Sequence, residues 1–186
     1  MATVTEDLVW NETHSSTGVS NWDRTTASDD SKASFATVST GNGNITFGLT
    51  NLSQTPTSIT SVQMRHESNA GASATVVIDA QMRNSSDSQL NQQYTSFSTA
   101  TDNSVTNMTV HTTNGGTSAA WTESDINTLR IYLKYHTESG TAGDSAIDHF
   151  YVRVIYEAPD PVSGMIKLNS GLVKLNSGLV KIIGVD

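Results

Sequence analysis

The sequence predicts an all-β protein whose antiparallel strands form a sandwich or a barrel. Along several short segments apolar residues alternate with polar ones, which is the period of a half-buried strand. Clusters of Gly, Asn, Asp and Ser separate these segments and favour turns. With 186 residues, 35% of them hydrophobic and 15% charged, the chain is long enough to bury a substantial core. We therefore expect a globular body rather than a disordered chain.

Four segments carry the clearest strand pattern, namely 61–67, 75–82, 129–135 and 150–156. In the first of them Val62, Met64 and His66 share one face, while polar residues share the other. The first half of the second segment is apolar on both faces, which favours a strand near the centre of a sheet. Weaker strands are expected in five further segments, 7–10, 33–38, 44–52, 94–99 and 107–112. About nine short strands indicate an antiparallel sandwich or barrel.

One helical turn is expected within this β pattern, near residues 122–127. Thr122 is placed to cap the first backbone amides, and Asp125 is placed to bond back to Thr122. Trp121 before the cap and Ile126 after it have the spacing of a hydrophobic staple. We expect Trp121 to fill part of the core rather than to stack on a ligand.

Residues 159–186 are expected to form a separate tail after the body of residues 1–158. The composition changes at Pro159-Asp160-Pro161, and no Thr follows Thr141. Between 163 and 183 a seven-residue unit, Ser-Gly-Leu-Val-Lys-Leu-Asn with small changes, occurs three times. The apolar positions of this tail, expected to contact other subunits or a neighbouring protein, are Met165, Ile166, Leu168, Leu172, Val173, Leu175, Leu179, Val180 and Ile182.

Two conformations of the tail stay open. Its main apolar residues are spaced alternately by three and four, as in a coiled coil. However, Gly, Ser and Asn together cost a helix about 2 kcal/mol in a heptad, and Asn-Ser-Gly turns between short apolar stretches favour strands. We favour β structure. In either conformation one copy cannot bury its apolar faces alone, so the tail predicts an oligomer, with a trimer as the hypothesis.

Composition and charge exclude several classes of partner. The net charge of −8 comes from ten basic and eighteen acidic residues, and a nucleic-acid ligand would need a basic surplus. Without Cys, neither a disulfide nor a thiolate metal site forms. The acidic N-terminus has no signal peptide, and no run of apolar residues is long enough for a membrane span. We expect a protein made in the cytoplasm, with no membrane partner.

No motif in the chain indicates catalysis or a cofactor. The five His lack metal-ligand spacing, and a Gly-x-Ser-x-Gly nucleophile motif is absent. Two acidic clusters offer oxygen ligands for Ca²⁺, but without EF-hand spacing they are better interpreted as solvated loops. These clusters are Asp23, Asp29 and Asp30 in one loop and Asp144 and Asp148 in another. We expect a protein that is not an enzyme and that needs no cofactor.

Aromatic residues offer candidate contacts to a sugar, since saccharides stack on exposed rings. The candidates are Trp10, Trp22 and the pair Tyr132 and Tyr151. Packing in the core or in an interface is the alternative role for each of them.

Residues 61–157 resemble a family of jelly-roll modules from the virion proteins of tailed phages. The motif that carries the resemblance is Trp-Thr-Glu-Ser-Asp-Ile-Asn-Thr-Leu-Arg-Ile at 121–131. It is preceded by strand segments like those at 62–66 and 74–82, and it is followed by one like that at 147–156. The resemblance implies a jelly-roll β-sandwich in a virus particle. It transfers no catalytic residue.

From this resemblance we expect a virion structural protein, and foremost a capsid decoration or cement protein on the outside of the particle. The repeats of the tail also resemble C-terminal segments of phage structural proteins. Expected partners are other copies of the chain and other capsid or tail proteins. The alternatives are a carbohydrate-binding module of a head or tail fibre that attaches to the host, a tail or neck component, and a sugar-active enzyme.

Overall fold

The computed structural model describes residues 1–20, 22–26, 33–35, 43–69, 75–97, 105–139, 146–159, 165–168 and 171–174. Its strands are β1 (Ala2–Thr17), β2 (Val19–Ser20), β3 (Ala33–Phe35), β4 (Asn44–Leu49), β5 (Ser58–Asn69), β6 (Thr75–Arg83), β7 (Gln89–Phe97), β8 (Thr106–His111), β9 (Arg130–Ser139), β10 (Ala146–Ala158), β11 (Met165–Leu168) and β12 (Gly171–Lys174). The short helices are η1 (Trp22–Thr26) and α1 (Glu123–Asn127).

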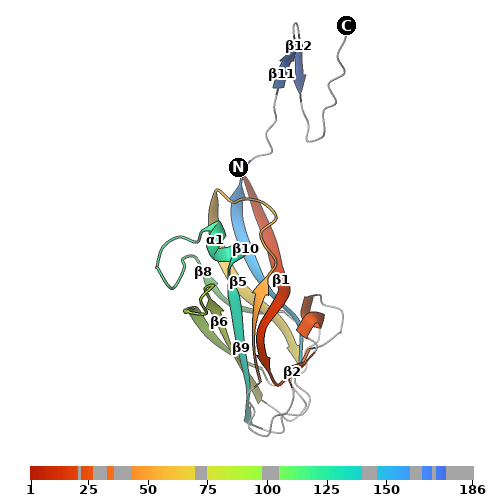
Figure 1. Ribbon diagram of the computed structural model, residues 1–186, viewed down its shortest axis with the longest axis vertical. Helices are drawn as coiled ribbons and strands as arrows, with labels where there is room; N and C mark the ends of the chain where they lie inside the picture. Colours follow the sequence, from red (N-terminus) through yellow and green to blue (C-terminus); the bar gives the residue numbers. More distant parts are fainter. Residues whose placement is uncertain are drawn as a thin grey trace.

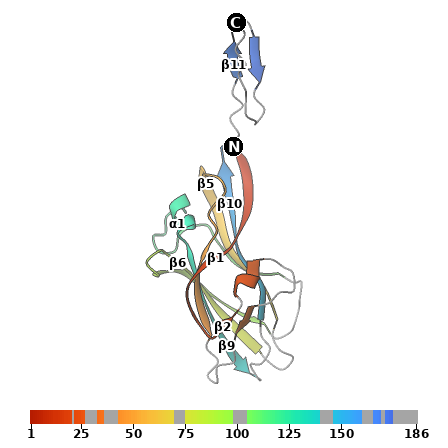
Figure 2. The same ribbon diagram turned by 45° about the vertical axis from the view of Figure 1, so that its right-hand side comes forward.

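The described strands β1 to β10 form one antiparallel sheet that folds over itself into two layers (Figures 1 and 2). The first layer has the order β1-β10-β5-β8, with β3 and β2 added at the beginning of β10. The second layer has the order β1-β4-β9-β6-β7. The fold is therefore all-β and close to a barrel in shape, as the alternating pattern predicts.

Strand β1 belongs to both layers. Its first half, from Ala2 to Val9, pairs with β10, and its second half, from Trp10 to Thr17, pairs with β4. The register shifts twice in the second half, and such bulges bend a strand and increase its twist. The curvature of β1 in Figure 1 follows from this change of partner, which closes one side of the body.

Side-chain contacts close the other side of the body, where β7 and β8 meet. The carboxamide of Gln93 accepts a hydrogen bond from the backbone N of Thr109 (2.6 Å) and donates one to its carbonyl O (3.3 Å). It therefore takes the place of a peptide group of a paired strand. Gln93 Nε2 also lies 2.8 Å from Nε2 of His111, whose pKa is lowered by burial. A neutral ring is the form that accepts this bond.

The core lies between the two layers. Phe47 of β4 and Phe150 of β10 are fully buried and meet edge to face, with ring centroids 5.6 Å apart and planes at 89°. Because one ring comes from each layer, this contact joins the layers, and such a pair contributes about 1 kcal/mol beyond its burial. Around it lie buried residues of both layers, among them Leu8, Ile45, Met64, Ile78, Met82, Ile131, Leu133, Val152 and Tyr156.

The clearest sequence predictions are confirmed. Val62, Met64 and His66 of β5 are fully buried, and so are alternate residues of β9 and β10. Strand β6, predicted near a sheet centre, lies between β9 and β7. At α1 the predicted capping box is present, because Thr122 and Asp125 exchange hydrogen bonds of 3.1 and 2.9 Å. Trp121 is buried and donates to the carbonyl O of His111.

The prediction for the first strand was wrong in extent. The sequence predicted residues 7–10, whereas β1 spans Ala2–Thr17. Residues 11–17 are all exposed, so no apolar alternation marks them. Strands β5, β7 and β10 also extend beyond their predicted bounds, because pairing with a neighbour continues past the apolar residues.

In the tail, β11 and β12 pair as an antiparallel hairpin that forms a sheet of its own. Met165 is paired with Lys174, and Leu168 with Gly171. The two strands fall in the first and second copies of the seven-residue repeat. Of the positions that the sequence singles out, Leu175, Leu179, Val180 and Ile182 lie outside the described residues.

Candidate functional site

The outward side of the second layer carries a row of polar and aromatic side chains. On β6 the residues Ile78, Ala80 and Met82 point into the core, so the residues between them point outward. Register places the neighbours on β7 and β9 beside them. We call this row the polar face, and it consists of Asp79, Gln81, Arg83, Gln92, Tyr94 and Tyr132.

Hydrogen bonds link the polar face into a chain. Both oxygens of Asp79 are used, since Oδ1 accepts from Gln92 Nε2 (3.1 Å) and Oδ2 from Gln81 Nε2 (3.3 Å). Gln81 Oε1 in turn accepts from Arg83 Nη2 at 2.8 Å. Gln92 is also bonded to the hydroxyl of Tyr94. Asp79 and Gln81 are only 8% exposed although they face outward, so their orientations are fixed by their neighbours.

Two aromatic rings belong to the polar face. The guanidinium carbon of Arg83 lies 3.9 Å from the ring centroid of Tyr132, a cation-π contact that holds both side chains. Tyr94 is 67% exposed. Planar amides, a guanidinium and aromatic rings in fixed positions are the groups that hydrogen-bond and stack on a saccharide.

A pocket of about 360 Å³ adjoins this face at Arg130, which is paired with Arg83. It lies between the second half of β1, β4, the turn from β6 to β7 and the beginning of β9. We call it the pocket, and it is lined by Asn11, Glu12, His14, Gly48, Leu49, Asn51, Ser85, Asn127, Thr128, Leu129 and Arg130.

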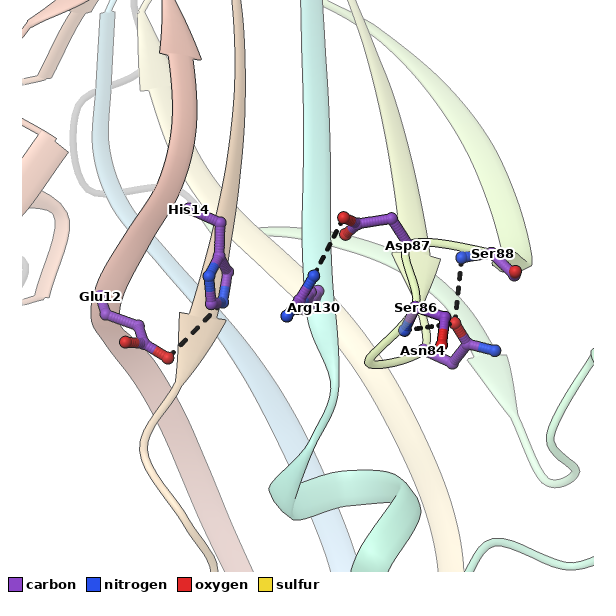
Figure 3. A network of polar contacts seen from close by, with 7 residues as sticks. All are labelled: Glu12, His14, Asn84, Ser86, Asp87, Ser88 and Arg130. Carbon is purple, nitrogen blue, oxygen red and sulfur yellow. Dashed lines mark hydrogen bonds and ion pairs between the residues drawn. The ribbon is translucent and has the colours of Figure 1, made fainter.

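An ion pair and a contact between a histidine and a carboxylate border the pocket (Figure 3). Arg130 Nη1 donates to Asp87 Oδ2 at 2.9 Å, and His14 Nε2 lies 3.5 Å from Glu12 Oε1. Figure 3 shows Arg130 between the His14 and Glu12 pair and the turn that carries Asp87. The guanidinium of the pocket is therefore already paired with a carboxylate.

The structure separates the aromatic residues that the sequence singles out. Tyr132 lies on the polar face of the second layer, as its candidate role requires. Tyr151 lies in the first layer, is 4% exposed and stacks on His149 with ring centroids 4.5 Å apart. Its burial agrees with the alternative role in packing, so the two tyrosines do not form one site. The side chain of Trp22, at the start of η1, lies outside what the structure describes.

The acidic clusters do not meet as a site in the described residues. Asp23 is exposed and Asp148 is buried, while Asp29, Asp30 and Asp144 lie outside the described residues. In the part of the chain that the structure describes, no group of three His, Asp or Glu residues is arranged to hold a metal ion. No helix in that part has the length and apolar character needed to cross a membrane.

Sequence reasoning missed most of the polar face. Asp79, Gln81 and Gln92 look like ordinary outward residues of a strand, and their proximity depends on the register between β6 and β7. One signal was present in the sequence, because Asp79, Gln81 and Arg83 recur at every second position. Such a run places three hydrogen-bonding side chains in a line along one face.

Comparisons with protein-family models, with curated proteins and with solved structures found no match to the chain.

Proposed function

We propose that the chain is a non-catalytic structural module on the outside of a virus particle, foremost a capsid decoration protein. In this proposal a jelly-roll body occupies the surface and the C-terminal tail binds neighbouring subunits. The proposal rests on the order of the strands, together with the resemblance of residues 61–157 to phage virion modules.

The order of the strands supports a jelly roll. In a jelly roll of eight strands, one layer contains the first, eighth, third and sixth strands, and the other contains the second, seventh, fourth and fifth. Without the short β2 and β3, the body has the layers β1-β10-β5-β8 and β4-β9-β6-β7, which follow this order. Jelly rolls are used in viral capsid proteins and in lectins. Both uses bind through the surface of the body or its loops and need no reactive group.

The tail supports assembly with other subunits. A hairpin with two strands of four residues is marginally stable in water by itself. The sequence nevertheless repeats the same apolar unit three times. Strands of this kind gain stability by pairing with strands from other copies, and three copies would build a small closed sheet. We therefore propose a trimer held by the tails.

Ending the chain after Pro159 should convert the trimer into a folded monomer. Residue Ala158 must be kept, because it is buried at the end of β10 and pairs with Ala2. The stability of the body should change by no more than about 0.5 kcal/mol, as for a substitution on the surface, so its melting temperature should change little. Light scattering after size exclusion gives the mass, and circular dichroism gives the melting curve. A full-length variant, Leu172→Asp, serves as a control of unchanged length and should also dissociate.

A full-length chain that is a monomer, or a shortened chain that remains a trimer, would contradict this role of the tail. The place in the particle is tested separately by immunogold electron microscopy of intact virions. Label over the head surface is the expected result. Label confined to the tail or neck would overturn the decoration role in favour of a tail component.

A second candidate function is carbohydrate binding, and the polar face is the observation that favours it. Ordered Gln and Asp side chains lie beside the rings of Tyr132 and Tyr94, so hydrogen bonding and stacking are available on one surface. Because these side chains already hold one another, binding costs little further ordering. A module of this kind would attach a virus particle to a host surface.

Replacing Tyr132 with alanine should weaken binding of any recognised glycan about fivefold, since a stacked ring contributes on the order of 1 kcal/mol. Tyr132→Phe keeps the ring and should retain most of the affinity. Glycan-array screening of the full chain, followed by calorimetric titration of the best ligand, measures both variants. Equal affinities of wild type and Tyr132→Ala would remove the polar face from this role.

A further inference from the structure

We infer that the pocket binds one neutral sugar unit. In this inference the pocket is the part of a glycan site that selects the sugar, and the site continues along the polar face. The inference rests on the second candidate function, carbohydrate binding, and names the place and the chemical class of its ligand. Four features of the pocket carry it: its size, its floor at Gly48, its charge balance and its fixed walls.

The size of the pocket suits a small ligand. Its volume of about 360 Å³ is near the lower end of the range of about 300 to 1,000 Å³ for ligand pockets in proteins. Its position next to Arg83 and Tyr132 means that a longer glycan can leave the pocket along the polar face. One sugar unit therefore fits inside, while the following units lie on the strands.

Gly48 forms the floor of the pocket. It lies within β4, between Glu12 of β1 and Arg130 of β9, and its outward position is flanked by the inward Phe47 and Leu49. A Cβ atom added there would lie 3.3 Å from Glu12 Cγ and from His14 Nε2. Glycine weakens a strand interior, and one reason for its presence is the close approach of a ligand. Here the side chains of Glu12 and His14 lie across the position that a larger residue would need, so a side chain at residue 48 would have to displace them.

The charge balance of the pocket favours an uncharged ligand. Arg130 is paired with Asp87, so a phosphate or carboxylate would have to displace an existing partner. The carboxylate of Glu12 in the lining also disfavours an anion. The remaining polar lining comes largely from amides and hydroxyls, those of Asn11, Asn51, Ser85, Asn127 and Thr128. An amide offers both donors and acceptors, as a sugar hydroxyl does. A neutral sugar therefore satisfies this lining without breaking an ion pair.

The walls of the pocket are fixed before a ligand binds. In the turn from β6 to β7, Asn84 Oδ1 accepts from the backbone N of Ser86 (2.9 Å) and of Ser88 (3.0 Å), as Figure 3 shows. These bonds hold Asp87 in the left-handed region, at φ 61°. On the other wall Asn127 Oδ1 accepts from the backbone N of Leu52 at 2.9 Å. Fixed walls reduce the ordering cost of binding.

The test is a titration of the ¹⁵N-labelled full chain with glucose, galactose, N-acetylglucosamine and rhamnose, followed by amide NMR shifts. We expect at least one of these sugars to shift amides of the pocket, among them Gly48, Asn51 and Leu129. Gly48→Val should reduce the affinity more than tenfold, because its side chain fills the floor. The backbone of Gly48 is not left-handed, so the change adds no backbone strain, but Glu12 and His14 must move to admit the side chain. The melting curve of the variant is therefore compared with that of wild type to show that it is folded. Val110→Ala, on β8 of the other layer, serves as the control and should bind like wild type.

The outcomes separate this inference from the function on which it rests. Shifts at the pocket that disappear in Gly48→Val support it. A sugar that binds but shifts only amides around Tyr94, or that binds Gly48→Val unchanged, overturns the pocket while carbohydrate binding stands. If neither these sugars nor any glycan of the array binds, both are overturned, and the proposal of a structural role in the virion is unaffected.

Discussion

Replacing Phe47 with alanine should lower the free energy of unfolding by about 4 kcal/mol, within the range for removing a buried aromatic ring. Phe47 is fully buried, and its ring meets Phe150 of the other layer. The change therefore leaves a cavity between the layers and removes a contact that joins them. Urea denaturation followed by circular dichroism, at one protein concentration for all variants, measures the loss.

Two further variants make this result specific. Phe47→Leu keeps most of the buried volume and should lose clearly less stability than Phe47→Ala. Val110 is 51% exposed, so Val110→Ala should stay within about 0.5 kcal/mol of wild type. If Phe47→Ala and Val110→Ala were equally stable, the two layers would not share the core described for them.

Acidification from pH 7 to pH 4 should destabilise the protein by about 3 kcal/mol through His66 alone. Burial lowers the pKa of His66 from its ordinary 6.5 to about 4, because the core disfavours the charged ring. Above pH 6.5 the ring is neutral in both states, and stability is undiminished. Between pH 6.5 and 4 the unfolded chain takes up the proton first, so stability falls, and below pH 4 the loss is complete. The difference between the two pKa values gives the magnitude.

The contribution of His66 can be separated from that of the carboxylates. His66→Gln replaces the ring by a group that does not titrate, so its free energy of unfolding should fall less steeply between pH 6.5 and 4. The measured quantity is this slope rather than the stability at pH 7, which the substitution also changes. It comes from urea denaturation at several pH values. Parallel slopes for the two proteins would show that His66 is already accessible to protons in the native state.

The sequence predicted the positions of the strands and of the helix better than it predicted how β1 connects the two layers. Val62, Met64 and His66 alternate with polar residues because β5 packs one face on the core, so periodicity alone locates the strand. The capping residues Thr122 and Asp125 act within one turn, so the helix was also predictable. In contrast, β1 changes partner between Val9 and Trp10 and has two bulges after that point, and both features depend on pairing with distant strands. No local preference of the exposed residues 11–17 encodes it.

The candidate site depends almost wholly on such long-range pairing. Tyr132 was singled out as an aromatic residue, but its partner Arg83 lies on a different strand and is brought beside it by the register of β6 and β9. Gly48 falls within the predicted strand 44–52 and was not singled out. What distinguishes it is the position of Glu12 and His14 on the adjacent strand, whose side chains lie 3.3 Å from where its Cβ would be. Contacts between residues so far apart in the chain are not visible in local sequence patterns.

The contact of Gln93 with Thr109 has a consequence for how molecules behave when crowded. An exposed strand with vacant donors and acceptors is a template on which foreign strands add, and this is a route to aggregation. At Thr109 both backbone groups are already engaged by the carboxamide. When copies lie close together on one surface, a strand of one copy therefore cannot pair with β8 of another at Thr109. The bodies would stay separate at this position.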